Sequence, residues 1–506
     1  MLDSTLISLP PSRPPIAILG VPFDNVTCAG AIDLIEGMIA SRRPHYLVTA
    51  NVDFLVQAGN DVELRRILLD AHLVLCDGTP LVWASRFLGN ALPERVAGAD
   101  LAPSLMRVAA EKQYRVFFLG ATPESAQEAV CNLQREHPAL MIAGHYSPPF
   151  SALLEMDHEE IKRRIRHARP DLLFVAFGCP KAEKWIAMHY RELGVPVVAG
   201  IGATIDFLAG RVKRAPHWMQ RAGVEWLFRL AQEPRRLARR YGRDLWVFGR
   251  RIVSQWLRLQ AGERPESGSV AIQIERQTGD ADAAMIAKLP DRLDVAVAPD
   301  GRCWMTPFLS RGRDCLLDLS AVRFIDSTGI ALLVRLRMRI RSMDRHLVLV
   351  APSRCIQRAL ALMHLGDYFD SAPDAAAARE IIATRRREEE ARVSPGAPDA
   401  APAVAWRGEI TAVSAGEVWN RTRDLLETPL RPASLVIDLS AARFIDSTGL
   451  RIMVQTQQLA RLRGTALVFA GAQPAVRNVL RNAGLELLLL EKPELSSLIA
   501  DPILAP

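Results

Sequence analysis

One twelve-residue pattern occurs twice in this chain of 506 residues, and it constrains how the second half folds. The segment 318–329 reads Asp-Leu-Ser-Ala-Val-Arg-Phe-Ile-Asp-Ser-Thr-Gly, and 438–449 repeats it with alanine in place of Val322. Self-similarity at this long offset indicates two copies of one small domain rather than a solenoid. Each copy is predicted to contain a buried strand, the Asp-Ser-Thr-Gly turn, a helix and a second strand.

Short apolar runs alternate with helical patterns in the first half of the chain. The runs predicted to be strands are 16–20, 45–50, 73–76, 116–120, 140–143, 172–178 and 195–202. This alternation predicts an open, mainly parallel α/β sheet. The fold class is therefore α/β throughout, with an open-sheet domain followed by a helical appendage and two small α/β domains.

Composition shifts set the predicted boundaries. The predicted parts are an N-terminal tail (1–15), the open-sheet domain (16–220), a basic helical appendage (221–260), a linker (261–269), the first repeat domain (270–384), a second, flexible linker (385–403) and the second repeat domain (404–500).

The net charge of +7 and the pI near 9.2 come from an uneven distribution of arginine. Arginine is concentrated between Arg211 and Arg258, which indicates a local anionic partner: nucleic acid, anionic lipid headgroups or a diphosphate ligand. No helix-turn-helix, RNA-binding aromatic motif or zinc spacing supports nucleic acid. The appendage also carries Trp246, Phe248 and Trp256 between its cations, as an interfacial membrane helix would. The alternative is a helix packed on the open-sheet domain with a solvated basic face.

The seven cysteines have no metal-ligand spacing and indicate buried free thiols in a reducing compartment. The N-terminal segment has no apolar signal region, and no apolar run reaches the ~18 residues of a membrane span. These features predict a cytoplasmic protein.

Polar residues follow two of the predicted strands. Thr49, Asn51 and Asp53 come at the end of the strand 45–50, and Asp77 follows the strand 73–76. Ligands of open α/β sheets bind at the carboxyl ends of the strands, so these side chains are expected to line one crevice. Taken alone, each run is equally compatible with an ordinary buried strand.

Eight motifs occur in order along the first half. They are Thr49-x-Asn51-x-Asp53, Cys76-Asp77-Gly78, Glu94-Arg95-Val96-x-Gly98, Gly178-x-Pro180-Lys181-x-Glu183-x-Trp185, Gly200-x-Gly202-Ala203, Arg214-Ala215-Pro216-x-Trp218, Glu225-Trp226-Leu227-x-Arg229-Leu230 and Glu233-Pro234-x-Arg236. This series resembles the WecG/TagA/CpsF glycosyltransferases (glycosyltransferase family 26) over about residues 16–258.

The resemblance implies an inverting hexosyltransferase of bacterial exopolysaccharide or cell-envelope synthesis. Such an enzyme moves N-acetylmannosamine, or a related hexose or uronic acid, from a UDP-sugar donor to a polyprenyl-diphosphate-linked saccharide. The expected location is the inner face of the cell membrane, with peripheral attachment. Asp77 matches the family's catalytic base, and Thr49 matches the threonine beside it. The alternative for Asp77 is a turn former before Gly78.

The same resemblance assigns a larger set of residues to substrate binding. They are Asn51, Asp53, Gly78, Arg95, Gly178, Pro180, Lys181, Glu183, Gly200, Gly202, Arg214, Arg229, Arg236 and Arg239. Arg95 would contact diphosphate or a sugar carboxylate; the alternative is a surface ion pair with Glu94. The glycines Gly200 and Gly202 would bind phosphate oxygens through backbone N–H groups at a helix start.

The chain departs from the family at Ala182, where a glutamine is usual, and this leaves the substrate identity open. No cofactor and no metal ion are expected. The Asp280-Ala281-Asp282 segment matches a metal-binding pattern of sugar transferases but lies beyond the catalytic segment. Arginines of the appendage would then neutralise the leaving UDP.

The repeated half resembles the STAS domain of anti-sigma-factor antagonists and sulfate transporters. In the antagonists a partner serine kinase phosphorylates the serine after the aspartate, and Ser327 and Ser447 hold that position. The alternative is that each serine only caps the following helix. The domains are expected to regulate or recruit the transferase. The competing hypothesis for the whole chain is a STAS-based signalling scaffold whose transferase domain is degenerate.

Overall fold

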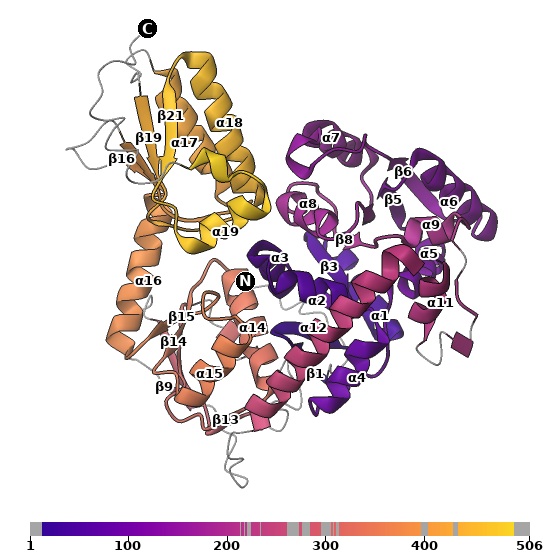
Figure 1. Ribbon diagram of the computed structural model, residues 1–506, viewed down its shortest axis with the longest axis horizontal. Coiled ribbons are helices and arrows are strands. Elements are labelled where there is room, and N and C mark those ends of the chain that lie inside the picture. Colours follow the sequence, from indigo (N-terminus) through magenta and orange to yellow (C-terminus); the bar gives the residue numbers. More distant parts are fainter. Residues whose placement is uncertain are drawn as a thin grey trace. The chain divides into compact units, whose positions relative to one another are not determined.

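The computed structural model describes residues 13–212, 214–216, 218–219, 224–232, 234–260, 273–275, 284–294, 305–306, 308–309, 313–395, 403–428 and 434–489. The linker 261–269 and the Asp280-Ala281-Asp282 segment lie outside the described residues, as does most of the tail 1–15. The chain forms two compact units, of which the first comprises 1–60 and 64–381 and the second 61–63 and 382–506 (Figure 1).

The centre of the first unit is a parallel sheet of six strands in the order β4-β3-β8-β7-β5-β6. The strands are β3 (His45–Ala50), β4 (Leu73–Cys76), β5 (Arg115–Gly120), β6 (Met141–Tyr146), β7 (Leu172–Ala176) and β8 (Val197–Gly200). All six were predicted from apolar runs, and the open parallel sheet is confirmed.

Helices cover both faces of this sheet, so its strands are apolar on both sides. Tyr46 and Val48 point into one core, and Leu47 points into the other. The connecting elements are α1 (Cys28–Ser41), α2 (Val52–Ala58), α3 (Val62–Leu69), α4 (Thr79–Phe87), α5 (Gly98–Lys112), α6 (Pro123–Glu136), η1 (Leu153–Glu155), α7 (His158–Ala168), α8 (Lys181–His189) and α9 (Thr204–Leu208).

The first predicted strand, 16–20, does not belong to this sheet. It forms β1 (Arg13–Ile18), which pairs antiparallel with β2 (Val21–Asn25) in a separate hairpin. Leu19 and Gly20 at the turn have φ of 50° and 88°, the left-handed region that tight hairpin turns use. The strand itself is confirmed, but its membership of the parallel sheet is not. An apolar run alone does not identify the partner with which a strand pairs.

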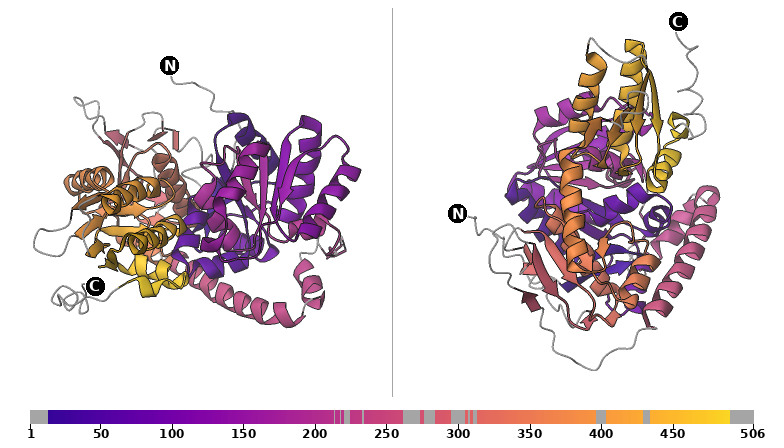
Figure 2. Two further views of the ribbon diagram at one scale, coloured as in Figure 1. Left: turned by 90° about the horizontal axis from the view of Figure 1, so that it is seen from above. Right: turned by 90° about the vertical axis from the view of Figure 1, so that its left-hand side faces the viewer.

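The appendage is helical in its described residues, as predicted. It consists of α11 (Glu225–Gln232) and α12 (Pro234–Gln260), the long helix seen in both views of Figure 2. Its three interspersed aromatic residues have different environments. Phe248 is buried in the core, Trp256 lies 5.0 Å from the ring of Phe87, and Trp246 is 75% exposed.

The first repeat domain completes the first unit with a five-stranded sheet in the order β15-β14-β12-β10-β9 and a two-stranded sheet β11-β13. Its elements are β9 (Gln273–Glu275), β10 (Met285–Lys288), β11 (Arg292–Leu293), β12 (Cys315–Asp318), β13 (Phe324–Ile325), α14 (Ser327–Arg341), β14 (Leu347–Val350), α15 (Arg354–Leu362) and β15 (Asp370–Ala372). A further helix, α16 (Ala375–Glu390), follows it.

The second unit contains the second repeat domain, with a four-stranded sheet β16-β17-β19-β21 and a two-stranded sheet β18-β20. Its elements are β16 (Val393–Pro395), β17 (Ala403–Trp406), β18 (Gly408–Ile410), α17 (Ala415–Glu427), β19 (Ser434–Asp438), β20 (Ala442–Ile445), α18 (Ser447–Arg463), β21 (Ala466–Ala470), α19 (Pro474–Asn482) and η2 (Glu486–Leu488). The predicted flexible linker 385–403 is partly regular structure, because α16 extends to Glu390 and β16 pairs antiparallel with β17.

The repeated Asp-Ser-Thr-Gly turn has the same structure in both copies. Asp326 caps α14 by accepting hydrogen bonds from the N–H groups of Thr328 and Gly329, and Asp446 caps α18 in the same way. The aspartate is therefore the cap, and the alternative in which the serine caps the helix is wrong. A side chain at Gly329 would place its Cβ 2.0 Å from the carbonyl oxygen of Leu293, which explains the glycine.

Within the first unit, the first repeat domain packs directly on the hairpin and on α12. A Cβ at Gly20 would lie 2.8 Å from the carbonyl oxygen of Met363, so only glycine permits this approach. The Gln255 side chain accepts from Leu19 N at 2.9 Å and donates to Ser327 Oγ at 3.0 Å. These contacts connect α12, β1 and the start of α14 at one point.

Arg335 of α14 provides the buried polar contact of this interface. Its guanidinium donates to the carbonyl oxygens of Ala71 at 2.5 Å and Pro22 at 3.0 Å and is paired with the Asp24 carboxylate. The side chain is 6% exposed. Removing one partner of such a pair leaves the other charge buried without compensation.

Arg335→Leu is expected to destabilise the first unit by about 3–5 kcal/mol, because Asp24 and two carbonyl oxygens lose their donor. The measurement is the midpoint of urea denaturation of the full chain. Arg358→Leu, the same change at an exposed position of α15, is the control and is expected to leave the midpoint unchanged. Equal midpoints for both variants would contradict a stabilising role of Arg335.

Candidate active site

Four adjacent strands of the parallel sheet end at one edge, and most of the predicted site residues follow them. Thr49 lies at the end of β3, Asp77 follows β4, Gly200 ends β8 and Gly178 follows β7. The backbone N–H of Asp77 donates to the carbonyl oxygen of Ala50 at 2.9 Å. Strand pairing sets Val48 of β3 against Gly200. The structure therefore brings these residues to the edge where open α/β sheets bind ligands.

Asp77 is a partly buried carboxyl group surrounded by charges of both signs. Burial raises its pKa from 3.8 to about 6, the nearby Arg229 and Arg95 oppose this shift, and Glu225 and Asp100 add to it. A carboxyl group with this pKa is ionised at neutral pH yet is a stronger base than an ordinary aspartate, which suits it to accept a proton.

Arg95 connects the sheet to the appendage. It donates to Glu225 Oε2 at 2.7 Å and to Asp100 Oδ2 at 2.6 Å, and Glu94 instead accepts from the N–H of Cys28. The ion pair with Glu94 is therefore absent from the described structure. The N–H of Val96 donates to the carbonyl oxygen of Cys76, which holds this segment at the end of β4.

Two further arginines share the same carboxylates. Arg214 lies 2.6 Å from Asp100, and Arg229 lies 3.5 Å from Glu225. Burial alone would raise the pKa of Glu225, but Arg95, Arg229 and Arg214 lower it. With Arg95, three guanidinium groups share two carboxylates, which leaves one positive charge in excess beside Asp77.

Glu183 of α8 lies under the sheet edge. A Cβ at Gly200 would be 2.8 Å from its Oε1, so the glycine makes room for the carboxyl group. Gly200 also accepts a hydrogen bond from Thr49 Oγ1 at 3.4 Å. Glu183 is 3% exposed, and burial raises its pKa to about 7. Thr49, Gly200 and Glu183 therefore lie together beneath the carboxyl ends of β3 and β8.

Three of the predicted binding residues have structural contacts. Asn51 caps α2 by accepting from the N–H of Phe54, and Asp53 accepts from Gln57 and lies 4.0 Å from Arg243. Gly78 precedes α4 with a φ of 156°, which favours glycine.

The Gly178–Lys181 segment forms a turn before α8 with a cis peptide bond at Pro180. Lys181 Nζ donates to the carbonyl oxygen of Ser151 at 2.6 Å and lies 5.4 Å from the ring of Phe177. Burial lowers the pKa of Lys181. Gly202 has a φ of 50° and precedes the five-residue helix α9.

Ala182, the position of the family departure, is 1% exposed and lies in the core beside Trp185. In this structure the Ala182 side chain packs α8 into the core and does not lie at the carboxyl ends of the strands. Arg239 is exposed on α12, and among the described residues it makes no hydrogen bond or ion pair with the Asp77 cluster. The side chain of Arg236 lies outside the described residues. Within the described ranges, no group of three or more His, Cys, Asp or Glu side chains is arranged to hold a metal ion.

Sequence reasoning missed Asp100, Glu225 and Thr204 as parts of the site. A Cβ at Gly98 would lie 3.3 Å from Thr49 Oγ1 and 3.4 Å from Thr204 Oγ1, which places these hydroxyl groups together. Glu225 stands within the Glu-Trp-Leu motif and Asp100 two residues after Gly98, so both were near recognised motifs. The pairing of Glu225 with Arg95 joins positions 130 residues apart and has no local signal.

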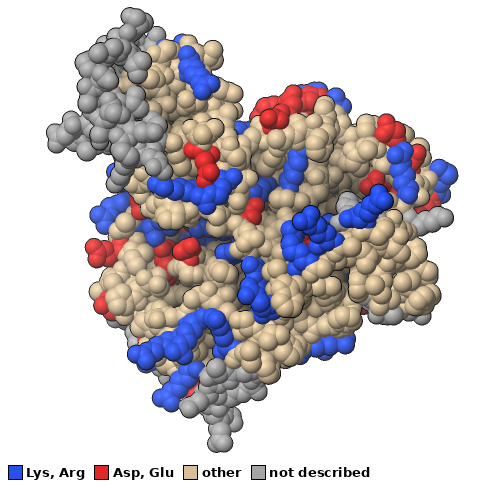
Figure 3. All heavy atoms as spheres, viewed as in Figure 1, with Lys and Arg blue, Asp and Glu red and all other residues tan. Residues whose placement is uncertain are grey.

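The appendage exposes both cations and apolar side chains. Lys and Arg side chains gather along α12 in Figure 3, and Arg240, Arg243 and Arg250 are exposed on it. Leu245, Trp246, Val253 and Leu257 of the same helix are 42–75% exposed. Across the described part of the chain, no helix is long and apolar enough to cross a membrane.

The open parallel sheet carries this carboxylate–arginine cluster at the carboxyl ends of its strands, and two repeat domains follow it in the chain. Residues 16–262 match the glycosyl transferase WecG/TagA/CpsF family model, and residues 271–378 and 390–497 match the STAS domain. The chain belongs to the WecG/TagA/CpsF family and carries two STAS domains.

Relatives support this assignment. Two proteins of Staphylococcus aureus, strains MW2 and NCTC 8325 / PS 47, are each 30% identical over 226 residues, which is 44% of this chain and 87% of theirs. Both are named N-acetylglucosaminyldiphosphoundecaprenol N-acetyl-beta-D-mannosaminyltransferase. An anti-sigma factor antagonist from Mycobacterium paratuberculosis matches 22% of this chain and 93% of its own, with 26% identity and a TM-score of 0.19. Because this score is low, the STAS assignment depends on the family model.

The raised pKa of Glu183 predicts a pH-dependent stability. The folded state holds the Glu183 proton more tightly than the unfolded state, so this group destabilises the fold as pH rises from about 4.5 through about 7. Glu183→Gln is expected to remove this term and to stabilise the protein at pH 8 by roughly 3 kcal/mol at most. Thermal unfolding at pH 5 and pH 8 measures it, with exposed Glu111→Gln as control. An unchanged pH dependence in Glu183→Gln would contradict the shift.

Proposed function

We propose that the chain is an inverting hexosyltransferase with a UDP-sugar donor and a polyprenyl-diphosphate-linked saccharide acceptor. The observation that carries the proposal is Asp77, placed at the end of β4 with a pKa raised to about 6, beside the Arg95–Glu225 cluster. The proposed donor sugar is N-acetylmannosamine or a related hexose or uronic acid, in keeping with the Staphylococcus aureus relatives. The proposed product belongs to an exopolysaccharide or cell-envelope polysaccharide.

In the proposed reaction, the Asp77 carboxylate takes the proton of the acceptor hydroxyl as its oxygen attacks the anomeric carbon of the donor. The new glycosidic bond forms on the face opposite the breaking bond to the diphosphate, which inverts the anomeric configuration. UDP leaves with the electron pair of that bond. Thr49, Gly200 and Glu183 would form the wall beside the sugar.

The three arginines of the cluster are the proposed counter-charges of the diphosphate. Arg95, Arg214 and Arg229 carry one positive charge more than Asp100 and Glu225 balance. Guanidinium groups bind phosphate oxygens through two parallel hydrogen bonds. In the proposed reaction these guanidinium groups, rather than a metal ion, stabilise the negative charge of the leaving diphosphate.

Asp77→Asn is expected to reduce UDP release by 100-fold or more, because general-base catalysis contributes about 10²–10⁴. In the wild type, the rate should fall as pH drops below about 6, where Asp77 becomes protonated. The assay is UDP release from a panel of UDP-sugars with a polyprenyl-diphosphate-linked N-acetylglucosamine acceptor. Exposed Asp33→Asn is the matched control. Equal, background rates for wild type and Asp77→Asn would favour the alternative of a STAS-based scaffold with a degenerate transferase domain.

We also propose that α12 attaches the protein peripherally to the inner face of the membrane. Exposed Arg240, Arg243 and Arg250 would face anionic headgroups, and Trp246 would enter the interface. The buried Phe248 cannot contribute, since it packs in the core.

Trp246→Ser is expected to lower binding to phosphatidylglycerol-containing vesicles several-fold, because the exposed indole would no longer insert. Vesicle co-sedimentation measures it. Leu462→Ser, at a residue 84% exposed on α18, is the control that changes an apolar surface residue elsewhere. If Trp246→Ser and Leu462→Ser bind vesicles as well as the wild type does, α12 is not the membrane contact.

The STAS domains are proposed to regulate or recruit the transferase, with a serine kinase or another protein as partner. Phosphorylation of Ser327 and Ser447 stays a prediction. Ser327 is 1% exposed, and its hydroxyl accepts from Gln255 of α12. A phosphate there would add about two negative charges to a buried contact, so its addition would require this contact to open.

Ser327→Asp is therefore expected to loosen the first STAS domain from β1 and α12, because an uncompensated carboxylate would be buried. Hydrogen–deuterium exchange of β1 and of the first turn of α14 should accelerate by tenfold or more. Ser320→Asp, at an exposed serine of the same domain, is the control. Wild-type exchange in Ser327→Asp would show that the contact tolerates a charge.

A further inference from the structure

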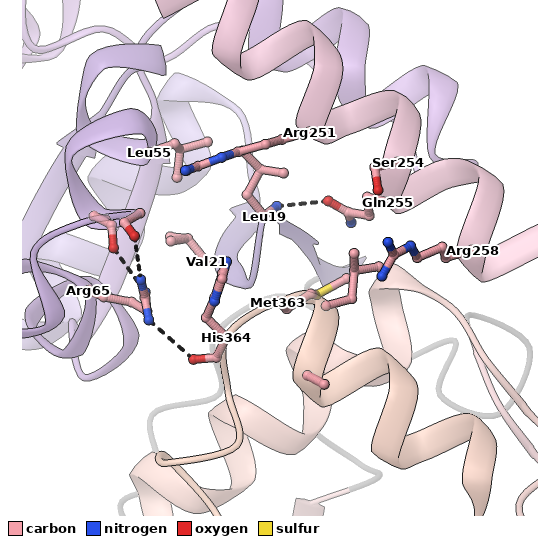
Figure 4. Close-up of a pocket in the computed structure, with 14 residues that line it drawn as sticks. Leu19, Val21, Leu55, Arg65, Arg251, Ser254, Gln255, Arg258, Met363 and His364 are labelled. Atoms are coloured by element: carbon pink, nitrogen blue, oxygen red, sulfur yellow. Dashed lines mark hydrogen bonds between the residues drawn. The ribbon is translucent and has the colours of Figure 1, made fainter. Parts of the chain in front are cut away.

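A cavity of the first unit lies between the transferase and the first STAS domain, separate from the Asp77 cluster. Its volume is about 260 Å³, slightly below the roughly 300–1,000 Å³ of typical small-molecule sites. The walls come from the β1–β2 hairpin, α2, α3, α12 and the end of α15 (Figure 4). None of the residues that line it belongs to the proposed catalytic site.

The polar part of this cavity is cationic. Arg65, Arg251, Arg258 and His364 line it, and its described lining residues include no Asp or Glu. Neither Arg251 nor Arg258 has a carboxylate partner among the described residues. Burial and then the charges of Arg65 and Arg251 lower the pKa of His364, so the neighbouring cations disfavour its protonated form.

The apolar part is formed by Leu19, Val21, Leu55, Leu362 and Met363. Figure 4 shows Leu19, Val21, Leu55 and Met363 around one space with the arginines, of which Arg251 and Arg258 enter from α12. The Arg251 guanidinium packs against Gly59, where a side chain would not fit because its Cβ would lie 2.0 Å from Arg251 Nη1. Arg65 is held by the carbonyl oxygens of Ala58, Gly59 and His364, which fixes its guanidinium at the rim.

We propose that this cavity binds a phosphate group carried on an apolar or small organic substituent. Guanidinium groups without carboxylate partners bind phosphate through paired, charge-assisted hydrogen bonds. A dianion between Arg251, Arg258 and His364 would compensate the excess of positive charge, and the apolar floor would cover the remainder of the ligand. The phosphate can belong to a soluble metabolite or to a lipid headgroup.

The residues that line the cavity come from both the transferase and the first STAS domain. Arg251 and Arg258 belong to the transferase appendage, whereas Met363 and His364 belong to the STAS domain. The Arg65–His364 hydrogen bond already joins the two sides at 3.3 Å. A ligand that contacts both sides binds the docked form better than the undocked form, and it therefore stabilises docking by its binding free energy.

The test uses the full chain and inorganic pyrophosphate, titrated by calorimetry. Arg251→Gln is expected to weaken binding about tenfold or more, the range of one lost charge-assisted hydrogen bond. His364→Asn, which retains a residue tolerant of the positive φ of 55°, is expected to weaken it about threefold. Arg358→Gln, at an exposed arginine of α15 that does not line the cavity, is the control and should bind as the wild type does.

A second arm identifies the source of the phosphate. The same variants are co-sedimented with vesicles of phosphatidylglycerol and phosphatidylcholine. Loss of pyrophosphate binding in Arg251→Gln and His364→Asn supports a soluble phosphate ligand, and loss confined to vesicle binding in both variants supports a lipid headgroup. His364 distinguishes the cavity from the basic face of α12, because it belongs to the other domain.

The proposal is overturned if neither variant weakens binding in either arm, or if Arg358→Gln weakens it as much as Arg251→Gln. Thermal unfolding of each variant without ligand confirms that the comparison is between folded proteins. The result is independent of the proposed transfer reaction, since Asp77→Asn tests turnover and these variants test binding at another place.

Discussion

The ion pair between Arg95 and Glu225 joins the sheet to the appendage at the candidate site. Arg95 follows β4 of the sheet, Glu225 begins α11 of the appendage, and the carboxylate side chain is 7% exposed. Breaking such a pair leaves a buried charge without a partner, so the pair holds α11 against the sheet. Arg229, four residues further along α11, is thereby placed where its charge lowers the pKa of Asp77. Asp77 and Arg229 thus come from two segments of the chain that this contact helps to hold together.

Much of the sheet could be predicted because its signals are local. Runs such as Leu73–Cys76 are apolar on both faces, as strands covered on both sides must be. The order of strands could not be read in the same way, because pairing depends on partners far along the chain. Ile16–Ile18 has the same apolar character as Leu73–Cys76, yet it forms a hairpin that packs on α14 instead of joining the sheet.

In the candidate site, too, residues with local sequence signals could be predicted, whereas contacts between distant segments could not. Thr49 and Asp77 could be predicted, since each follows a strand and the carboxyl ends of parallel strands meet. The partners of Arg95 could not, because Glu94 is adjacent in sequence but Glu225 is the group within reach of the guanidinium. The repeated Asp-Ser-Thr-Gly turn also shows what the sequence pattern alone could not identify. The pattern located the start of a helix correctly, but only the backbone conformation shows that Asp326, not Ser327, is the cap.

The arginines of the first unit occupy two electrostatic environments, and this difference affects how each set would bind an anion. Arg95 is already hydrogen-bonded to two carboxylates, and Arg214 is ion-paired with Asp100. A diphosphate must share or displace those partners, which reduces the net gain in binding free energy. In return these side chains are positioned before the ligand arrives, which lowers the entropy lost on binding. Arg251 and Arg258 have no carboxylate to displace, so an anion gains the full charge interaction there but must order one exposed side chain, that of Arg258. The arrangement at Arg95 and Arg214 favours precise orientation of a reacting group. The arrangement at Arg251 and Arg258 favours reversible binding, in which the occupied fraction of the site follows the ligand concentration. A catalytic site needs the former, whereas a site that reports the amount of a phosphate ligand to a docked STAS domain needs the latter.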